Sequence, residues 1–253
     1  MSEHVVVETE AEGRVLRLAF NRPERRNALT QAMYAAACDA LDRAAEDPAI
    51  RAVILHGEGE AFTAGNDLTD FARPADGEEP PVQRFLRTIL SFEKPVIAAV
   101  NGVAVGIGVT MLLHCDLVFA SETAAFRAPF AHVGVVPEAG SSLLLPQAVG
   151  MAMANDMLLG GRMLRADEAL TAGLVSRVYP PEALLPAALE TAADIAAQGP
   201  DAMRLSKRLI RSGREAIAKQ MKAEGVHFAA QLASAEFAEA TAAFMEKRKP
   251  NHG

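Results

Sequence analysis

The sequence predicts an α/β fold that ends in a helical C-terminal region. Short apolar runs alternate with helical segments up to about residue 180, a pattern typical of strands and helices packed around a sheet. After Pro181 the pattern is helical only. Half of the 253 residues are hydrophobic, which excludes a disordered chain. A chain of this length buries roughly 70–75% of its unfolded surface, so it needs no metal or disulfide to fold.

The N-terminal elements follow from short-range signals. Val5–Glu8 and Val15–Leu18 predict two strands around a turn at Gly13. The hydroxyl of Thr30 predicts the N-cap of a helix that runs to Leu41. Continuous apolar runs predict strands buried on both faces at 52–55, 95–100 and 117–120, and residues 124–126 follow the last of them.

The remaining segments predict helices, one loop and a last strand. Arg73–Pro81 is rich in proline, glycine and acids, which predicts a mobile loop. Leu174–Val178 predicts a strand. Helices are predicted at 82–92, 108–115, 142–149 and 151–159, and after residue 181 with breaks at 199–200, 213 and near 234.

Charge and cysteine content narrow the function classes. The formal net charge of −7 argues against a general nucleic-acid binder. The charge is uneven: residues 200–253 carry +4 and residues 1–199 carry −11. The basic tail is consistent with solvated helix faces, or with a face for a phosphate-bearing ligand or an acidic neighbouring subunit. With only Cys38 and Cys115 there is no disulfide framework, which indicates a reducing compartment.

A membrane location is not expected. The N-terminus is acidic and lacks the apolar core of a signal peptide. Val96–Leu113 is apolar and 18 residues long, enough to raise the question of a membrane span. Asn101-Gly102 signals a turn inside this run, and two further glycines interrupt a helix, so a strand, a turn and a helix explain it better. We therefore expect a cytoplasmic protein with neither a membrane nor nucleic acid as partner.

Several catalytic and cofactor motifs are absent. Gly106-Ile107-Gly108 lacks the third glycine of a dinucleotide-binding loop. No Walker lysine follows a glycine loop, and there is no G-x-S-x-G nucleophile elbow. The six histidines have no metal-ligand spacing, so no metal is expected.

Two predicted strands are followed by glycine-containing turns, at 61–68 and 101–108. Ligands gather at the carboxyl ends of strands in α/β sheets, and glycine lets the backbone approach a ligand closely. A helix that begins near Gly108 would present free amides at its N-terminus. Two such turns could form an oxyanion hole, although each alone is equally consistent with a structural turn.

Glu138 lies between Pro137 and Ala139 in a largely apolar stretch. Removal from water would raise its pKa, as a catalytic acid–base group requires. The alternative is an acidic residue near a helix start, stabilised by the helix dipole.

Taken together, these segments resemble the crotonase superfamily, the enoyl-CoA hydratase/isomerase family, over nearly the whole chain. The ordered set carries the resemblance, because each segment alone is weak. The segments are Asn21-Arg22-Pro23 with Asn27-Ala28-Leu29, 61–68, 95–115, 126–142, Gly160 with 166–169 and 173–175, and 243–248.

The resemblance implies a fold of stacked β-β-α turns in an α/β spiral core, residues 1–195, that binds a CoA thioester. Residues 196–253 would form a helical trimerisation region, giving a homotrimer or a dimer of trimers. The ligand is an acyl-CoA or enoyl-CoA, so coenzyme A is part of the substrate and no separate cofactor is expected. The resemblance places the oxyanion hole at the amides of Asn66 and Ile107. It places CoA contacts at Arg25, Arg26, Ala28, Ala64, Asp67, Leu68, Phe244 and Lys247, the last two toward a neighbouring subunit.

The reaction is less directly implied. Hydratases of this family use two glutamates, and the matching positions here are Thr110 and Phe130, which cannot act as acid or base. Glu138 matches the single glutamate of the peroxisomal-type enoyl-CoA delta-isomerases, so the prediction is a β,γ-to-α,β isomerase with Glu138 as proton shuttle. The alternatives are a hydratase that recruits Asp70 or Glu78 beside Glu138, other enolate chemistry, or a CoA-binding protein without activity. Asp67 could instead hold its own loop through amide hydrogen bonds.

Overall fold

Three successive pairs of strands divide between two sheets. The computed structural model describes residues 3–71, 79–246 and 248–251. In each pair the first strand enters a six-stranded sheet, the second enters a four-stranded sheet, and helical structure follows. These are the stacked β-β-α turns that the resemblance implies. The pairs are β3 (Ala52–Gly57) with β4 (Ala61–Thr63), β5 (Val96–Val100) with β6 (Val103–Val105), and β7 (Leu117–Ser121) with β8 (Ala125–Arg127).

The six-stranded sheet has the order β1-β2-β3-β5-β7-β10, and the four-stranded sheet has the order β4-β6-β8-β9. β1 (Val5–Glu10) and β2 (Val15–Phe20) form the predicted antiparallel hairpin, and the strands from β2 to β10 (Arg177–Tyr179) pair in parallel. In the smaller sheet only β9 (Met163–Arg165) runs antiparallel to its neighbour. Because β4, β6 and β8 are parallel, the turns that follow them lie at one edge of that sheet.

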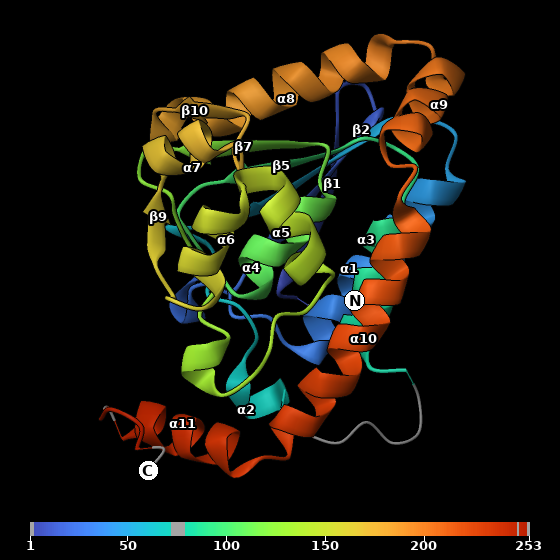
Figure 1. Ribbon diagram of the computed structural model, residues 1–253. Helices are drawn as coiled ribbons and strands as arrows, with labels where there is room; N and C mark the ends of the chain where they lie inside the picture. The colour runs from blue at the N-terminus through green and yellow to red at the C-terminus, as the bar shows by residue number, and fades with distance from the viewer. Residues whose placement is uncertain (1–2, 72–78, 247, 252–253) are drawn as a thin grey trace.

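The helices surround both sheets (Figure 1). Before residue 180 they are α1 (Gln31–Glu46), α2 (Leu68–Phe71), α3 (Pro81–Ser91), α4 (Ile107–Thr110), α5 (Ser141–Val149), α6 (Met151–Leu158) and α7 (Ala166–Ala172). The C-terminal helices are α8 (Pro181–Ala197), α9 (Pro200–Ile210), α10 (Arg214–Leu232) and α11 (Ala235–Met245). Short 3-10 turns are η1 (Pro23–Arg25), η2 (Met111–His114) and η3 (Ala131–Val133).

Alternation along the strands gives the large sheet two apolar faces. On one face Ile54, Ile97 and Phe119 pack against α8, which lies along the sheet in Figure 1. On the other face, the residues next to them in sequence join the main core with α1 and α3. Burial on both faces explains why these strands read as continuous apolar runs rather than as alternating patterns.

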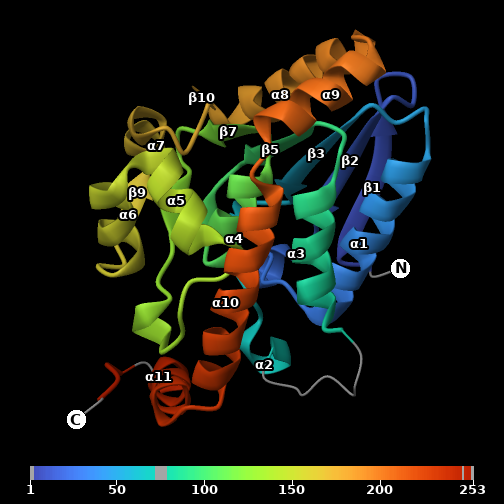
Figure 2. The same cartoon turned by 45° about the vertical axis from the view of Figure 1, so that its right-hand side comes forward.

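Helix α1 shows how local sequence sets an element. The hydroxyl of Thr30 accepts a hydrogen bond from the amide of Met33 at 3.2 Å, which confirms the predicted N-cap. The helix continues to Glu46, beyond the predicted end at Leu41. It packs against α3, and α3 packs against α10, so these three helices lie side by side in Figure 2.

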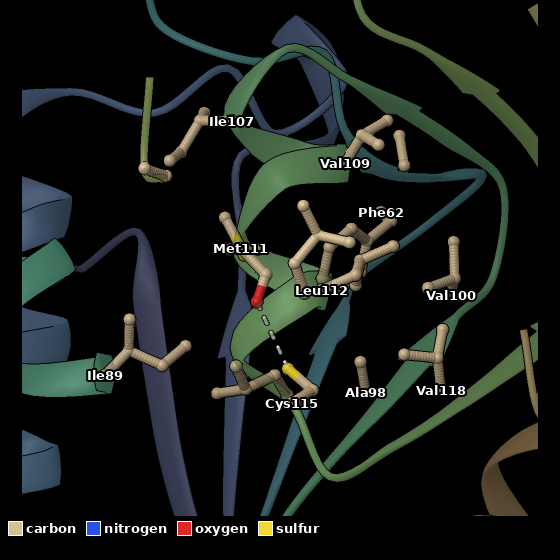
Figure 3. Close-up of a cluster of buried hydrophobic side chains, with 14 of the residues drawn as sticks. Phe62, Ile89, Ala98, Val100, Ile107, Val109, Met111, Leu112, Cys115 and Val118 are labelled. Carbon is tan, nitrogen blue, oxygen red and sulfur yellow. Dashed lines mark hydrogen bonds between the residues drawn. The ribbon is translucent and has the colours of Figure 1, made fainter. Parts of the chain in front are cut away.

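The apolar run from Val96 to Leu113 is not one segment. It divides into β5, β6, α4 and part of η2, so the predicted helix 108–115 begins earlier and tightens into a 3-10 turn. Figure 3 shows Val109 and Leu112 near strand side chains such as those of Phe62 and Val100, and Ile107 is buried as well. Among the described residues, no helix is long and apolar enough to cross a membrane.

Other expectations need correction. The strand predicted at Leu174–Val178 is wrong in position, because β10 spans Arg177–Tyr179. Leu174 and Val175 instead follow the C-cap of α7, where their amides bond to the carbonyl of Ala169 and their side chains are buried. The short strands β4, β6 and β9 and helix α7 had not been predicted. The segment predicted as a mobile loop, Arg73–Pro81, falls mostly at 72–78, outside the described residues.

The C-terminal helices break where the sequence predicted. α8 ends before Gly199, α9 before Gly213 and α10 before Ser234. The predicted division at residue 195 falls in the last turn of α8, and that helix packs on the large sheet. The division into two regions therefore stays a prediction.

Candidate active site

Glu138 stands just before α5, at the wall of a large cavity. Its carboxyl group accepts a hydrogen bond of 2.5 Å from the hydroxyl of Thr110, which lies in α4 and is fully buried. Withdrawal from water raises the pKa of Glu138 to about 7, with the Thr110 hydrogen bond opposing and the charge of Glu224 adding to the rise. A carboxyl group with this pKa can both take and return a proton near neutral pH.

The cavity has a volume of about 1380 Å³. Glu138 and Asn66 both line it, so the structure brings together two residues that the sequence singled out separately. α3 and α10 form much of its wall with apolar side chains, and five further charged or polar groups from α2, α3 and α10 or their flanks reach it. The apolar wall includes Val82, Leu86, Leu90, Met221, Val226 and Leu232; the polar groups include Asp70, Glu79, Arg87, Lys222 and Gln83.

The two glycine-containing turns touch one another. β4 and β6 pair in parallel, and the backbone of Gly65 approaches Val105 so closely that a Cβ on Gly65 would lie 2.9 Å from the Val105 carbonyl oxygen. Gly65 also has φ of +93°, a conformation that glycine adopts without strain. The glycine is thus required both by the turn and by the contact between the two loops.

Asn66 follows Gly65 and Ile107 follows Gly106, and both residues carry free amide groups. Within the described part of the chain, the N–H groups of Asn66 and Ile107 donate to no protein acceptor. Ile107 is the first residue of α4, so its amide has no partner within the helix. Ile107 is 1% exposed and is not among the residues that line the cavity, so its amide as an oxyanion donor stays a prediction.

Tyr34 was not predicted as a site residue. Its hydroxyl donates a 2.5 Å hydrogen bond to Oδ1 of Asn66, and its ring packs on Phe85. Burial raises the pKa of Tyr34 well above its ordinary value, and the nearby Glu138 charge adds to the rise, so the phenol stays protonated. Tyr34 is one helical turn into α1 and reads in sequence as a core aromatic, so no sequence signal separated it from the core.

The predicted CoA residues near the N-terminus lie in adjoining loops. Arg25 and Arg26 are exposed, and the amide of Ala64 donates to the carbonyl of Arg26 at 2.8 Å. Ala28 is half-buried and bonds to Arg25 through its amide. The structure therefore brings the 25–28 and 64–67 segments together, and of these residues only Asn66 is among those described as lining the cavity beside Glu138. Their contact with CoA remains a prediction.

Asp67 makes the hydrogen bonds within its own loop that were the structural alternative to a CoA contact. It accepts hydrogen bonds from the amide and hydroxyl of Thr69, at 3.0 and 2.6 Å, and pairs with Arg22 at 2.6 Å. Burial would raise the pKa of Asp67, but the bonds from Thr69 and Arg22 outweigh it and lower the pKa to about 2. Asp67 is therefore a charged anchor of its loop.

For the other predicted CoA contacts the structure gives only their place in the chain. Leu68 is the first residue of α2, and Phe244 lies in α11. Lys247 falls outside the described residues. Their contact with a neighbouring subunit's CoA stays a prediction.

The two positions that match hydratase glutamates are both buried. Thr110 is 0% and Phe130 is 5% exposed. Phe130 joins the main core, so it contributes no acid or base. Thr110 instead contacts Glu138, a role that the sequence did not reveal because the two residues come from separate turns of the fold.

Comparisons with known proteins agree with this architecture. A family model described as enoyl-CoA hydratase/isomerase matches residues 10–253. The crystal structure of an enoyl-CoA hydratase/isomerase from Pseudoalteromonas atlantica T6c superposes with a TM-score of 0.95 and 53% identity, covering 99% of this chain and 100% of that one.

Curated relatives carry both reaction names. Enoyl-CoA delta isomerase 2 from Rattus norvegicus is 39% identical over 212 residues, which are 81% of this chain and 54% of the rat protein, so the chain spans about half of that relative. The 2,3-dehydroadipyl-CoA hydratase of Escherichia coli K12 is 36% identical over 255 residues, covering 99% of this chain and 98% of the relative. Since the family model spans nearly the whole chain and the fold agrees, this protein belongs to the enoyl-CoA hydratase/isomerase family of the crotonase superfamily.

Proposed function

We propose that this enzyme shifts a β,γ double bond of an enoyl-CoA to the α,β position, with Glu138 as the proton shuttle. The observation that carries the proposal is the cavity lined by both Glu138, whose carboxyl group has a pKa of about 7, and Asn66, whose main-chain amide donates to no acceptor in the described chain. Phe130 at the second hydratase position supports isomerisation, which needs a single carboxyl group.

The chemistry follows from these groups. The thioester carbonyl oxygen accepts hydrogen bonds from the amides of Asn66 and Ile107, which strengthen as negative charge develops on that oxygen. Glu138 takes the proton from the α-carbon, and the electron pair spreads over the oxygen and the γ-carbon. Glu138 then returns the same proton to the γ-carbon, leaving the double bond conjugated with the thioester. No atom is gained or lost overall.

The test is turnover of trans-3-hexenoyl-CoA, followed as gain of the absorbance of the conjugated thioester. Wild-type enzyme is expected to turn over, and Glu138→Gln is expected to lose about 10³-fold in rate while CoA-thioester binding is retained. Gln is a close match in size, so a loss of rate without loss of binding isolates the proton transfer. Unchanged turnover in Glu138→Gln would overturn the assignment.

A second candidate, hydration of a trans-2-enoyl-CoA, is favoured by Asp70. Its side chain lines the same cavity as Glu138, and one of its carboxylate oxygens accepts from the amide of Gln31 at 2.7 Å. Glu78, the other acid considered, lies outside the described residues. Loss of conjugated absorbance on incubation with crotonyl-CoA supports hydration, and its dependence on Asp70→Asn would assign the second acid. Binding of both substrates without turnover supports a CoA-binding protein without activity.

We further propose the homotrimer, alone or paired, that the resemblance implies. Its support is an uncovered apolar surface on α9, where Leu209 and Ile210 are 77% and 80% exposed. Burial of such a surface between subunits stabilises an assembly. Sedimentation equilibrium at micromolar concentration distinguishes a monomer from a trimer or hexamer, and Leu209→Glu is expected to shift the distribution toward smaller species.

A further inference from the structure

The backbone that carries Glu138 is held from α10 by a second carboxyl group. Glu224 is 5% exposed, and it accepts hydrogen bonds from the amide of Gly140 at 2.6 Å and the amide of Ser142 at 3.0 Å. The Ser142 hydroxyl adds a third bond of 2.5 Å. Gly140 is the N-cap of α5 and has no side chain to cap the helix, so Glu224 supplies that function from a different helix.

Burial raises the pKa of Glu224, and its hydrogen bonds from Ser142 and Gly140 oppose that rise by favouring the ionised form. Gln220 donates to the Ser142 oxygen at 2.8 Å, and the Ser142 hydroxyl in turn donates to Glu224. Both backbone partners are donors as well. Three donors therefore point at this carboxyl group, which stabilises its ionised form.

The held segment needs this support. Ala139 has φ of +61° and Gly140 of +73°, so two consecutive residues adopt the left-handed conformation, which is unfavourable for alanine. From the opposite side, His114 contacts the Ala139 carbonyl oxygen at 2.8 Å. Burial lowers the pKa of His114 to about 4, so the ring is neutral and donates from Nε2. Loop and α10 are also close-packed, because a Cβ on Gly140 would lie 3.0 Å from Ile217.

We propose that Glu224 is a positioning residue for Glu138: it fixes the backbone on which Glu138 stands and places a second negative charge behind that carboxyl group. This inference rests on the proposed isomerase function. A like charge nearby disfavours ionisation of Glu138, which makes Glu138 a stronger base once it is ionised. The helix that forms one wall of the substrate cavity thereby also sets the strength of the base.

Other ionisable groups around Glu138 do not replace this charge. Tyr34 from α1 and His114 from η2 are held neutral. The remaining charged groups line the same cavity from other elements: Asp70 of α2, Glu79 and Arg87 at α3, and Lys222 of α10.

The test is the pH profile of kcat/KM for trans-3-hexenoyl-CoA isomerisation in Glu224→Gln. The acidic limb, which reports ionisation of Glu138, is expected to move down by about one pH unit, and the plateau rate to fall because the base is weaker. A limb that stays at its wild-type position overturns the inference. If the wild-type enzyme itself fails to isomerise the substrate, the proposed function fails instead, so the two failures are distinguishable.

A second pair of variants leaves Glu224 in place. Gln220 lies one turn before it on α10 and is half-buried. Gln220→Lys introduces a positive charge that offsets Glu224 and is expected to move the acidic limb down, whereas Gln220→Met loses the same hydrogen bond without a charge and is expected to leave the limb in place. Equal shifts in both variants, or no shift in Gln220→Lys, overturn the electrostatic role even if Glu224→Gln does not fold.

Discussion

The hydroxyl of Thr110 donates a 2.5 Å hydrogen bond to Oε1 of Glu138. This bond connects α4 to Glu138, the proposed base. The first residue of α4 is Ile107, whose amide is the proposed oxyanion donor. It stabilises the ionised form of Glu138 and so opposes the effects of burial and of Glu224 on its pKa. The proton affinity of Glu138 is thus set by opposing contributions from residues on different elements.

Replacing Thr110 with Val is expected to raise the acidic limb of kcat/KM. The variant keeps the shape but removes a hydrogen bond to a charged group, which is worth about 1.5 kcal/mol, or roughly one pH unit. Thr110→Ser keeps a hydroxyl and serves as the control. The shift has the opposite direction to that expected for Glu224→Gln, so steady-state pH profiles of both variants separate the two contributions. A limb that moves down in Thr110→Val contradicts this account.

Glu138→Gln is expected to make the folded protein more stable at neutral pH. Folding raises the Glu138 pKa from 4.5 to about 7, so its contribution to stability is fully present below pH 4.5 and is lost as pH rises through about 7. At about 1.4 kcal/mol per pH unit this amounts to up to roughly 3 kcal/mol. Urea unfolding of both proteins at several pH values measures it. A stability difference that is the same at pH 4.5 and pH 8 would refute the expected linkage.

Tyr34→Phe is expected to reduce kcat/KM about tenfold while the protein stays folded. The ring contact with Phe85, at 5.4 Å between centroids, survives this change. The hydrogen bond to Asn66 is lost, and the Asn66 side chain can then rotate within the cavity wall. Initial rates with trans-3-hexenoyl-CoA and a thermal melt measure both effects. Loss of the folded state, with no separate effect on rate, would assign Tyr34 to the core alone.

Lys207→Met is expected to destabilise the fold by about 3 kcal/mol without changing the rate at permissive temperature. The Lys207 ammonium is 6% exposed and bonds to Asp116 at 2.7 Å and to the Lys94 carbonyl at 2.6 Å, which ties α9 to the large sheet. The variant leaves the Asp116 carboxylate without its nearest cation. Urea denaturation gives the value, and Asp116→Asn added to Lys207→Met should restore part of it. Arg211 also pairs with Asp116, at 3.7 Å, so a loss under 1 kcal/mol would show that Arg211 compensates.

The sequence by itself determined the elements whose physics is local or strongly patterned. Thr30 predicted the start of α1, the apolar runs predicted strands buried on both faces, and Gly199, Gly213 and Ser234 predicted the breaks between the C-terminal helices. Segments of three or four residues, such as β4, β6 and β9, carry too few residues for a period to emerge, so they were missed. Leu174 and Val175 look like strand residues because burial at a helix end requires the same side chains.

Motif order placed Glu138, Asn66 and Ile107 among the candidates, and the structure gathers the first two at one cavity. Only the tertiary structure decided what surrounds them. Tyr34, Thr110, His114 and Glu224 come from four different helical elements, and each contacts the site across a long stretch of chain. A pKa depends on burial and on charges in space, and neither can be read from neighbours in sequence. The sequence therefore identified the acid, while packing decided how strongly that acid holds its proton.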